Sequence, residues 1–164
     1  MKSRRGSLQD IALIAAVLLF FSIILLFSFK ITGAWNDQIQ TMTDIPTEAK
    51  TSSNQLLGYY SGSMDYGFLI LAIGLGIATL ILAALVRVHP VFIPFYFLGL
   101  LVLIVLCAVF SNIYQEMAAN TQLISFADKL VFTSHILNYL PLIVGTFGIL
   151  LMIVMYKLWS VSQE

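Results

Sequence analysis

The sequence predicts an all-α integral membrane protein in which four helices cross the bilayer. Four apolar runs contain no Asp, Glu, Lys, Arg or His, and about 20 helical residues suffice to cross a hydrocarbon core of about 30 Å. The composition is 60% hydrophobic and 10% charged, whereas about a quarter of the residues of a soluble domain are charged. Lys and Arg also stand at the ends where a consistent membrane orientation requires them. The predicted spans are residues 11–29, 67–86, 91–111 and 136–156, within a single domain of residues 1–164.

The uncharged spans exclude several classes of function. Ionisable groups inside a membrane normally mark ion paths, proton relays or cofactor sites, so most transporters and membrane enzymes are disfavoured. The formal net charge of zero argues against a nucleic-acid partner. The single cysteine, Cys107, can neither form an internal disulfide nor run dithiol exchange. We therefore expect no catalytic residue, no metal site and no cofactor.

The charges around the spans predict that both termini face the cytoplasm. Lys2, Arg4 and Arg5 precede the first run, Arg87–Pro90 joins the second to the third, and Lys157 follows the fourth. Positive residues concentrate on the cytoplasmic side, so these three segments belong there. The first run is longer than a signal-peptide core and is interpreted as an uncleaved signal anchor. The outer side receives mostly acidic residues, namely Asp37, Asp44, Glu48, Asp65, Glu116 and Asp128.

The first outer segment, residues 32–66, is expected to be a polar loop. It is rich in Thr, Ser, Asn, Gln and Gly, which favour turns. A short helix fits Pro46–Leu57, where Pro46 would occupy the first helical position. Two interpretations stay open, a solvated connector and a loop that docks on a partner. Tyr59 and Tyr60 fit either an aromatic belt at the membrane surface or a partner contact.

The second outer segment, residues 112–135, is expected to be an extended helical hairpin. The third span continues without a breaker to Ala119, and Asn120-Thr121 is the expected reversal. Ser125 and Asp128 have the spacing of a capping box, and apolar residues at helical spacing follow. The resulting amphipathic helix would contact the membrane, the third span or a partner. Candidate partner contacts on the outer side are Tyr59, Tyr60, Glu116, Phe126, Asp128 and Leu130.

Small residues predict where the helices pack, because association in lipid depends on close backbone approach. One stripe lies on the second span and a pair of glycines on the fourth. Packing inside the bundle and contact with a second protein both remain open for this stripe. Pro141 lacks an N–H and should bend the fourth span. The candidate packing residues are Ala72, Gly76, Thr79, Ala83, Gly145 and Gly148.

The third predicted span and its flanks, His89–Ala119, read HPVFIPFYFLGLLVLIVLCAVFSNIYQEMAA, and Leu140-Pro141 follow in the fourth span. This pattern resembles small uncharacterised integral membrane proteins of viruses and phages. Some of these viruses carry a lipid layer beneath the capsid. The resemblance covers the C-terminal half and contains no catalytic motif. It implies a structural role, with helices in the membrane and outer segments that touch other assembly proteins.

These observations favour a non-enzymatic structural or accessory subunit of a larger membrane assembly, in a cell membrane or a virion membrane. Its partners would be the lipid bilayer and other membrane or assembly proteins, or further copies of the chain. A second hypothesis is a homo-oligomeric pore or holin-like protein. A third is the membrane anchor of an electron-transfer complex, although His89 and His135 lie at opposite faces and cannot ligate one iron. The pore would be lined by the hydroxyls of Ser22, Ser28, Thr79, Ser111 and Thr146.

Overall fold

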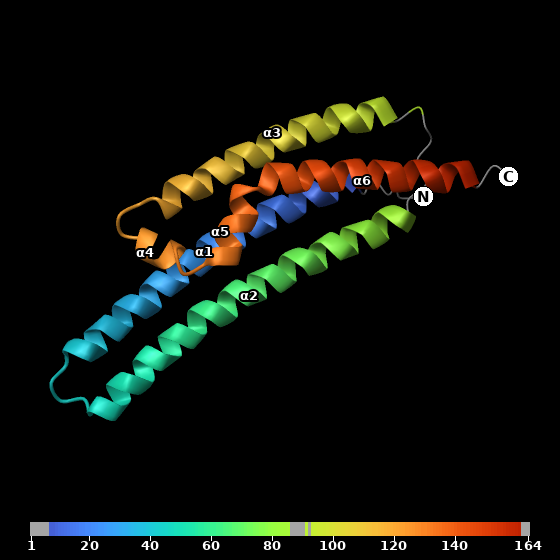
Figure 1. The fold of residues 1–164 in the computed structure, drawn as a ribbon. Coiled ribbons are helices and arrows are strands. Elements are labelled where there is room, and N and C mark those ends of the chain that lie inside the picture. Colours follow the sequence, from blue (N-terminus) through green and yellow to red (C-terminus); the bar gives the residue numbers. More distant parts are fainter. Residues whose placement is uncertain (1–6, 86–90, 92, 162–164) are drawn as a thin grey trace.

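The computed structural model describes residues 7–85, 91 and 93–161, and within these ranges the chain is helical without any strand. The predicted all-α class is therefore confirmed. Among the described residues, three helices are long and apolar enough to cross a membrane, and a bent pair would make a fourth span. The helices, drawn in Figure 1, are α1 (Ser7–Thr41), α2 (Thr47–Leu85), α3 (Ile93–Ala118), α4 (Ile124–Ala127), α5 (Val131–Asn138) and α6 (Leu140–Val161).

The helices form two antiparallel pairs, α1 with α2 and α3 with α6, which pack on each other (Figure 1). The start of α1 and the end of α6 lie at one end of the bundle, here called the termini end. The turn between α1 and α2 lies at the opposite end, here called the hairpin end, and projects beyond α4 and α5. The turn Arg87–Pro90, predicted to lie on the side of the termini, is outside the described residues.

The core lies along α1, whose buried face meets the other three long helices. Leu26 and Phe29 are buried there, together with Phe68 of α2, Leu103 of α3 and Leu151 of α6. Large apolar side chains also cover the outward faces of the same helices. Soluble proteins rarely expose so much contiguous apolar surface, so this exterior is compatible with a membrane protein. The outward set includes Leu13, Phe20, Ile24, Leu98, Val102, Val105, Leu142 and Ile153.

The expected polar loop of residues 32–66 is wrong in its secondary structure, because α1 and α2 run through it. Between Thr41 and Thr47 lies the only break in the helices of this segment. Pro46 stands one residue ahead of α2, and its carbonyl accepts the N–H groups of Ala49 and Lys50. Asn36, Gln40, Ser53 and Asn54 bond across the hairpin, and such tertiary contacts override weak propensity. Other hydroxyls of the segment donate to carbonyls of their own helix, namely those of Thr32, Thr51, Ser52 and Ser61.

The fourth predicted span, residues 136–156, is broken rather than continuous. α5 ends at Asn138, α6 begins at Leu140, and the two are bent by 64°. The bend expected at Pro141 is thus confirmed, and Pro141 stands in the first turn of α6, where no N–H is needed. α6 has 22 residues, which corresponds to about 33 Å of helix.

The helical hairpin predicted for residues 112–135 is present in outline, and its details differ from the prediction. α3 ends at Ala118 and the chain reverses around Asn120, as expected. The amphipathic helix is a single turn, α4, followed by a separate α5. Ser125 makes no capping box with Asp128, because Leu123 is the N-cap residue of α4 and no side chain caps it.

Candidate functional site

Asp65 of α2 is the only buried carboxylate among the described side chains, with 5% of its surface exposed. Its Oδ2 accepts the N–H of Phe132 at 2.8 Å, and its Oδ1 accepts the N–H of Thr133 at 2.7 Å. The Thr133 hydroxyl also donates to Oδ1, at 2.8 Å. First-turn N–H groups have no partner within their own helix, and negative charge is favoured beside them. Asp65 therefore caps α5 from another helix.

The other end of α5 is held by α3. The Ser111 hydroxyl donates to the carbonyl of Asn138, the last residue of α5, at 3.1 Å. Gln115 in turn donates to the Ser111 hydroxyl at 3.2 Å. Midway along α5, the buried Tyr114 hydroxyl pairs with that of Ser134 at 3.0 Å. The short helix is thus fixed at its start, middle and end by side chains of α2 and α3.

An open pocket of about 380 Å³, lined by both polar and apolar side chains, lies between α3, α4 and α5. Gln115, Asp128, Ser134, His135 and Asn138 contribute to its lining. No group of three or more His, Cys, Asp or Glu side chains is close enough to hold a metal ion within the described part of the chain. The other histidine of the third hypothesis, His89, is outside the described residues.

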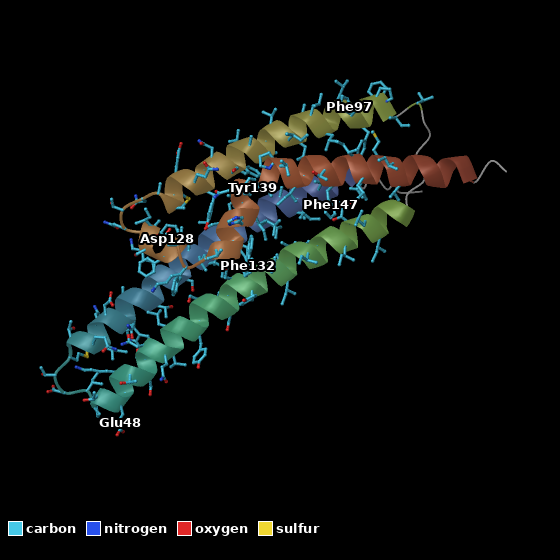
Figure 2. All side chains as sticks on the ribbon, viewed as in Figure 1. Glu48, Phe97, Asp128, Phe132, Tyr139 and Phe147 are labelled. Carbon is cyan, nitrogen blue, oxygen red and sulfur yellow. The ribbon has the colours of Figure 1, made fainter. Side chains whose placement is uncertain are left out.

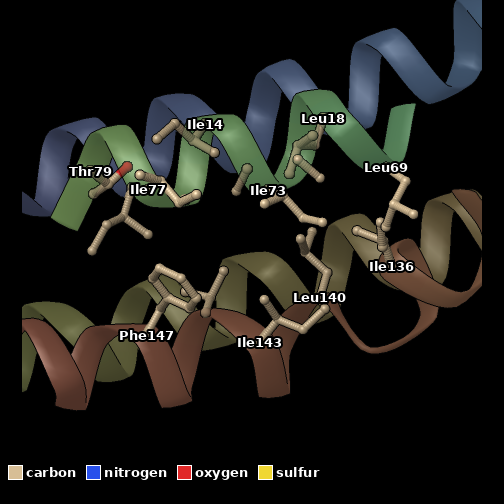
Figure 3. A pocket seen from close by; sticks show the side chains of 15 residues that line it. Ile14, Leu18, Leu69, Ile73, Ile77, Thr79, Ile136, Leu140, Ile143 and Phe147 are labelled. Carbon is tan, nitrogen blue, oxygen red and sulfur yellow. The ribbon is translucent and has the colours of Figure 1, made fainter. Parts of the chain in front are cut away.

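An apolar groove of about 360 Å³ lies between α1 and α2 on one side and α5 and α6 on the other (Figure 3). Ala72, Gly76 and Thr79 of the predicted stripe line it. The Thr79 hydroxyl donates to the carbonyl of Leu75 within its own helix. The other side chains that line the groove are apolar. A Cβ at Gly76 would lie 3.2 Å from the ring of Phe147. The stripe hence faces α6 across the groove, and the side chain of Ala83 lies outside the described part.

Glycines bring α6 close to α3. A Cβ on Gly148 would overlap the Leu100 side chain, and one on Gly145 would lie 3.4 Å from Ile104. The Tyr96 hydroxyl donates to the backbone carbonyl of Gly148 at 3.2 Å. Both glycines therefore face α3, within the chain.

The six candidate partner contacts divide into two groups. Tyr59 is 75% exposed, and Glu116 and Asp128 are also exposed. Tyr60, Phe126 and Leu130 are used inside the chain. Tyr60 pairs with the Ser28 hydroxyl at 2.7 Å, the Phe126 ring lies 5.3 Å from that of Phe29, and Leu130 is fully buried. Leu130 is thus a core residue, because the α4–α5 turn folds back on the bundle.

The five hydroxyls proposed to line a pore are not gathered by the fold. Ser22, Thr79 and Thr146 each donate to a carbonyl of their own helix. Ser28 pairs with Tyr60 and Ser111 with Asn138. They stand on four different helices, α1, α2, α3 and α6, and each is engaged within the chain.

Sequence reasoning missed Asp65 as a capping residue and Gly33 as a packing position. A Cβ on Gly33 would lie 2.5 Å from the ring of Phe126, which packs α4 on α1. Comparison of the chain with protein-family models, curated proteins and solved structures gives no match.

Proposed function

We propose that this chain is a non-enzymatic integral membrane protein that serves as a structural or accessory subunit of a larger membrane assembly. The observation that carries the proposal is the length of the α1–α2 hairpin. α1 has 35 residues and α2 has 39, which correspond to about 53 Å and about 59 Å of helix. A hydrocarbon core is about 30 Å thick, so a large part of the hairpin would extend beyond it.

The polar residues favour projection of the hairpin end. Asp37, Asp44, Glu48 and Lys50 lie near the turn, where Figure 2 labels Glu48 far from the apolar middle of the bundle. Charges are costly in hydrocarbon, so this end belongs in water. The positive charges near the two termini favour a position of both ends of the chain on the cytoplasmic side of a cell membrane or on the inner side of a virion membrane.

The projecting part is stiffened by hydrogen bonds between its two helices. The Asn36 amide donates to Asn54 at 2.7 Å and accepts from the Ser53 hydroxyl at 2.7 Å. Nearer the turn, the Gln40 side-chain amide donates to the backbone carbonyl of Lys50 at 2.9 Å. In return, the Lys50 ammonium donates to the backbone carbonyl of Gln40 at 3.0 Å. This ordered part of the hairpin, residues 36–59, is here called the arm. Because it is already ordered, it can bind a partner without a large entropic cost of ordering.

The arm also carries exposed apolar side chains that fit a protein contact. Leu56 and Tyr59 are 68% and 75% exposed and stand three residues apart, hence on one face of α2. Aromatic residues are enriched at protein interfaces. We infer that this face of the arm touches another protein of the assembly.

A pull-down of the tagged full-length chain in mild detergent, with mass spectrometry and native mass determination, tests the proposal. We expect stoichiometric recovery of other proteins with the wild type, and their loss with Leu56→Ala combined with Tyr59→Ala. The matched control replaces Leu98 and Val102, two exposed residues of α3, by alanine and should retain the partners.

Recovery of the chain alone from its native membrane would contradict the proposal. If that chain formed a defined ring, the pore hypothesis would replace it, and conductance of liposomes holding the protein would be the next measurement. Equal loss of partners in the α3 control would show that the loss is not specific to the arm, contrary to the assigned contact face.

A further inference from the structure

Two lysines that are far apart in the sequence each make a contact between α1 and the chain around α4. The Lys30 ammonium donates to the Gln122 side-chain oxygen at 2.9 Å, across 92 positions of the sequence. The Lys129 ammonium lies 5.6 Å from the centroid of the Phe29 ring. Gln122 precedes α4 and Lys129 follows it, while Phe29 and Lys30 are neighbours on α1. The two positive charges thus flank the contact between α1 and α4.

Neither ammonium forms an ion pair with a described side chain; their partners are the neutral amide of Gln122 and an aromatic ring. The Asp65 carboxylate accepts hydrogen bonds from the backbone of α5. The Glu116 carboxylate accepts a hydrogen bond from the Asn112 amide. Asp128, labelled beside α4 in Figure 2, is the one carboxylate on the same turn. Counted together with Asp128, the two lysines carry one net positive charge.

The surface lies at the level where lipid headgroups would stand, a step that rests on the proposed membrane placement. Lys30 directly follows the uncharged run of residues 11–29. Beside it, Phe27 and Ile31 of α1 are exposed, and their apolar side chains suit contact with acyl chains. The Phe126 ring packs edge-on against Phe29, the same ring that the Lys129 ammonium contacts.

We propose that Lys30, Lys129 and Gln122 form a binding site for the phosphate of an anionic phospholipid in the leaflet at the hairpin end. Ammonium groups make charge-assisted hydrogen bonds to phosphate oxygens. The Gln122 amide nitrogen is a further donor, since the amide oxygen is taken by Lys30. A zwitterionic headgroup would bring its own positive charge towards the two lysines. A lipid with an uncharged headgroup beyond its phosphate, such as phosphatidylglycerol, avoids that repulsion.

Native mass spectrometry of the full chain in mild detergent tests the site. The protein is mixed with equal amounts of phosphatidylglycerol and phosphatidylcholine that carry the same acyl chains, and the retained lipids are counted. We expect the wild type to prefer phosphatidylglycerol. Lys30→Gln combined with Lys129→Gln should lower that preference by about fivefold per lysine, the equivalent of about 1 kcal/mol each.

Two further variants separate the lysine site from general charge effects. Lys50→Gln removes a lysine charge on the arm, where the ammonium bonds to the Gln40 carbonyl, and should leave the preference unchanged. Lys30→Arg combined with Lys129→Arg should retain it, because guanidinium groups also bind phosphate. An equal preference for both lipids in the wild type, or an unaltered preference in the double Gln variant, would overturn the proposal.

Inorganic phosphate and flotation separate the remaining outcomes. If inorganic phosphate alone raises the melting temperature of the wild type in phosphatidylcholine, and not that of the double Gln variant, the site binds small anions and the lipid assignment is wrong. A chain that does not float with phosphatidylcholine vesicles would remove the membrane placement itself. That failure is distinct from loss of lipid selectivity by a chain that floats.

Discussion

Asp65 illustrates how a buried charge is tolerated in an otherwise apolar bundle. Burial of a carboxylate is costly unless donors surround it. Two backbone N–H groups and one hydroxyl converge on Asp65, all from the first turn of α5. The same bonds fix where the chain turns back between α4 and α6, so one side chain sets the position of a whole element.

Replacement of Asp65 by Asn should destabilise the fold by about 2–3 kcal/mol. The Asn oxygen can still accept the Thr133 bonds, but its NH₂ group would oppose the N–H of Phe132, and the favourable charge is lost. Thermal unfolding in detergent measures the effect. Asp37→Asn, at an exposed position of α1, removes the same charge and should change little; equal shifts in the two variants would contradict the capping role.

Two glycines of different surroundings test the packing of α3 on α6. Gly148→Ala places a methyl group against Leu100, where no space exists, and should cost about 1–3 kcal/mol. Gly74→Ala meets open space and should be neutral or stabilising by up to about 1 kcal/mol through helix propensity. Both variants are compared by thermal unfolding in one detergent. Destabilisation by Gly74→Ala alone would reverse the assignment of the packed face.

At the scale of elements, the α1–α2 hairpin shows how side-chain hydrogen bonds between two helices support the helical structure of both. Asn36, Ser53 and Asn54 have weak helix propensity, yet their side chains bond to each other between the two helices. The polar part of α1 and α2 is helical because each helix supplies partners for the other. This is also why the hairpin forms an arm rather than a loop.

The arm should open locally when Asn36 is replaced by Ala. Its bonds to Asn54 and Ser53 contribute roughly 1 kcal/mol each, so amide hydrogen exchange in the facing segment of α2 should accelerate by at least about tenfold. Gln38→Ala, on an exposed position of the same helix, should leave exchange unchanged. Uniform acceleration throughout the chain would indicate global destabilisation, contrary to a locally held arm.

At the scale of the whole molecule, two antiparallel pairs put the start of α1 and the end of α6 at one end and the hairpin turn at the other (Figure 1). If the bundle spans a membrane, these ends must face opposite sides. The positive charges near the termini then favour the cytoplasm for that end. The apolar exterior of the described helices supplies the surface that lipid would cover.

A labelling experiment checks this arrangement. Asp44→Cys, in the turn between α1 and α2, should react with a membrane-impermeant maleimide in intact cells or spheroplasts. The native Cys107 is buried and should stay unlabelled. Epitope tags at the two termini should become accessible only after permeabilisation. If the introduced thiol and the tags were all accessible in intact cells, a bundle with its ends on opposite sides would be contradicted.

The local part of the fold could be predicted because its causes are local. Pro141 marks the bend, since proline is tolerated in the first turn of a helix but not in its interior, and the polar residues around Asn120 mark the reversal. The capping box predicted at Ser125 and Asp128 is wrong because Leu123, and not Ser125, is the N-cap residue of α4. Asp65 could not be singled out, because it is one of six acidic residues on its side and its partners lie 67 and 68 positions away.

By itself, the sequence determined that the chain is helical and has several segments apolar enough for a membrane, since length, hydropathy and proline act on each segment separately. The tertiary structure decided which polar groups meet. It alone made Asp65 the cap of α5, turned residues 32–66 into paired helices and buried Leu130. The physical reason is that a hydrogen bond or a packed contact needs two partners, and here those partners come from segments that no local pattern joins.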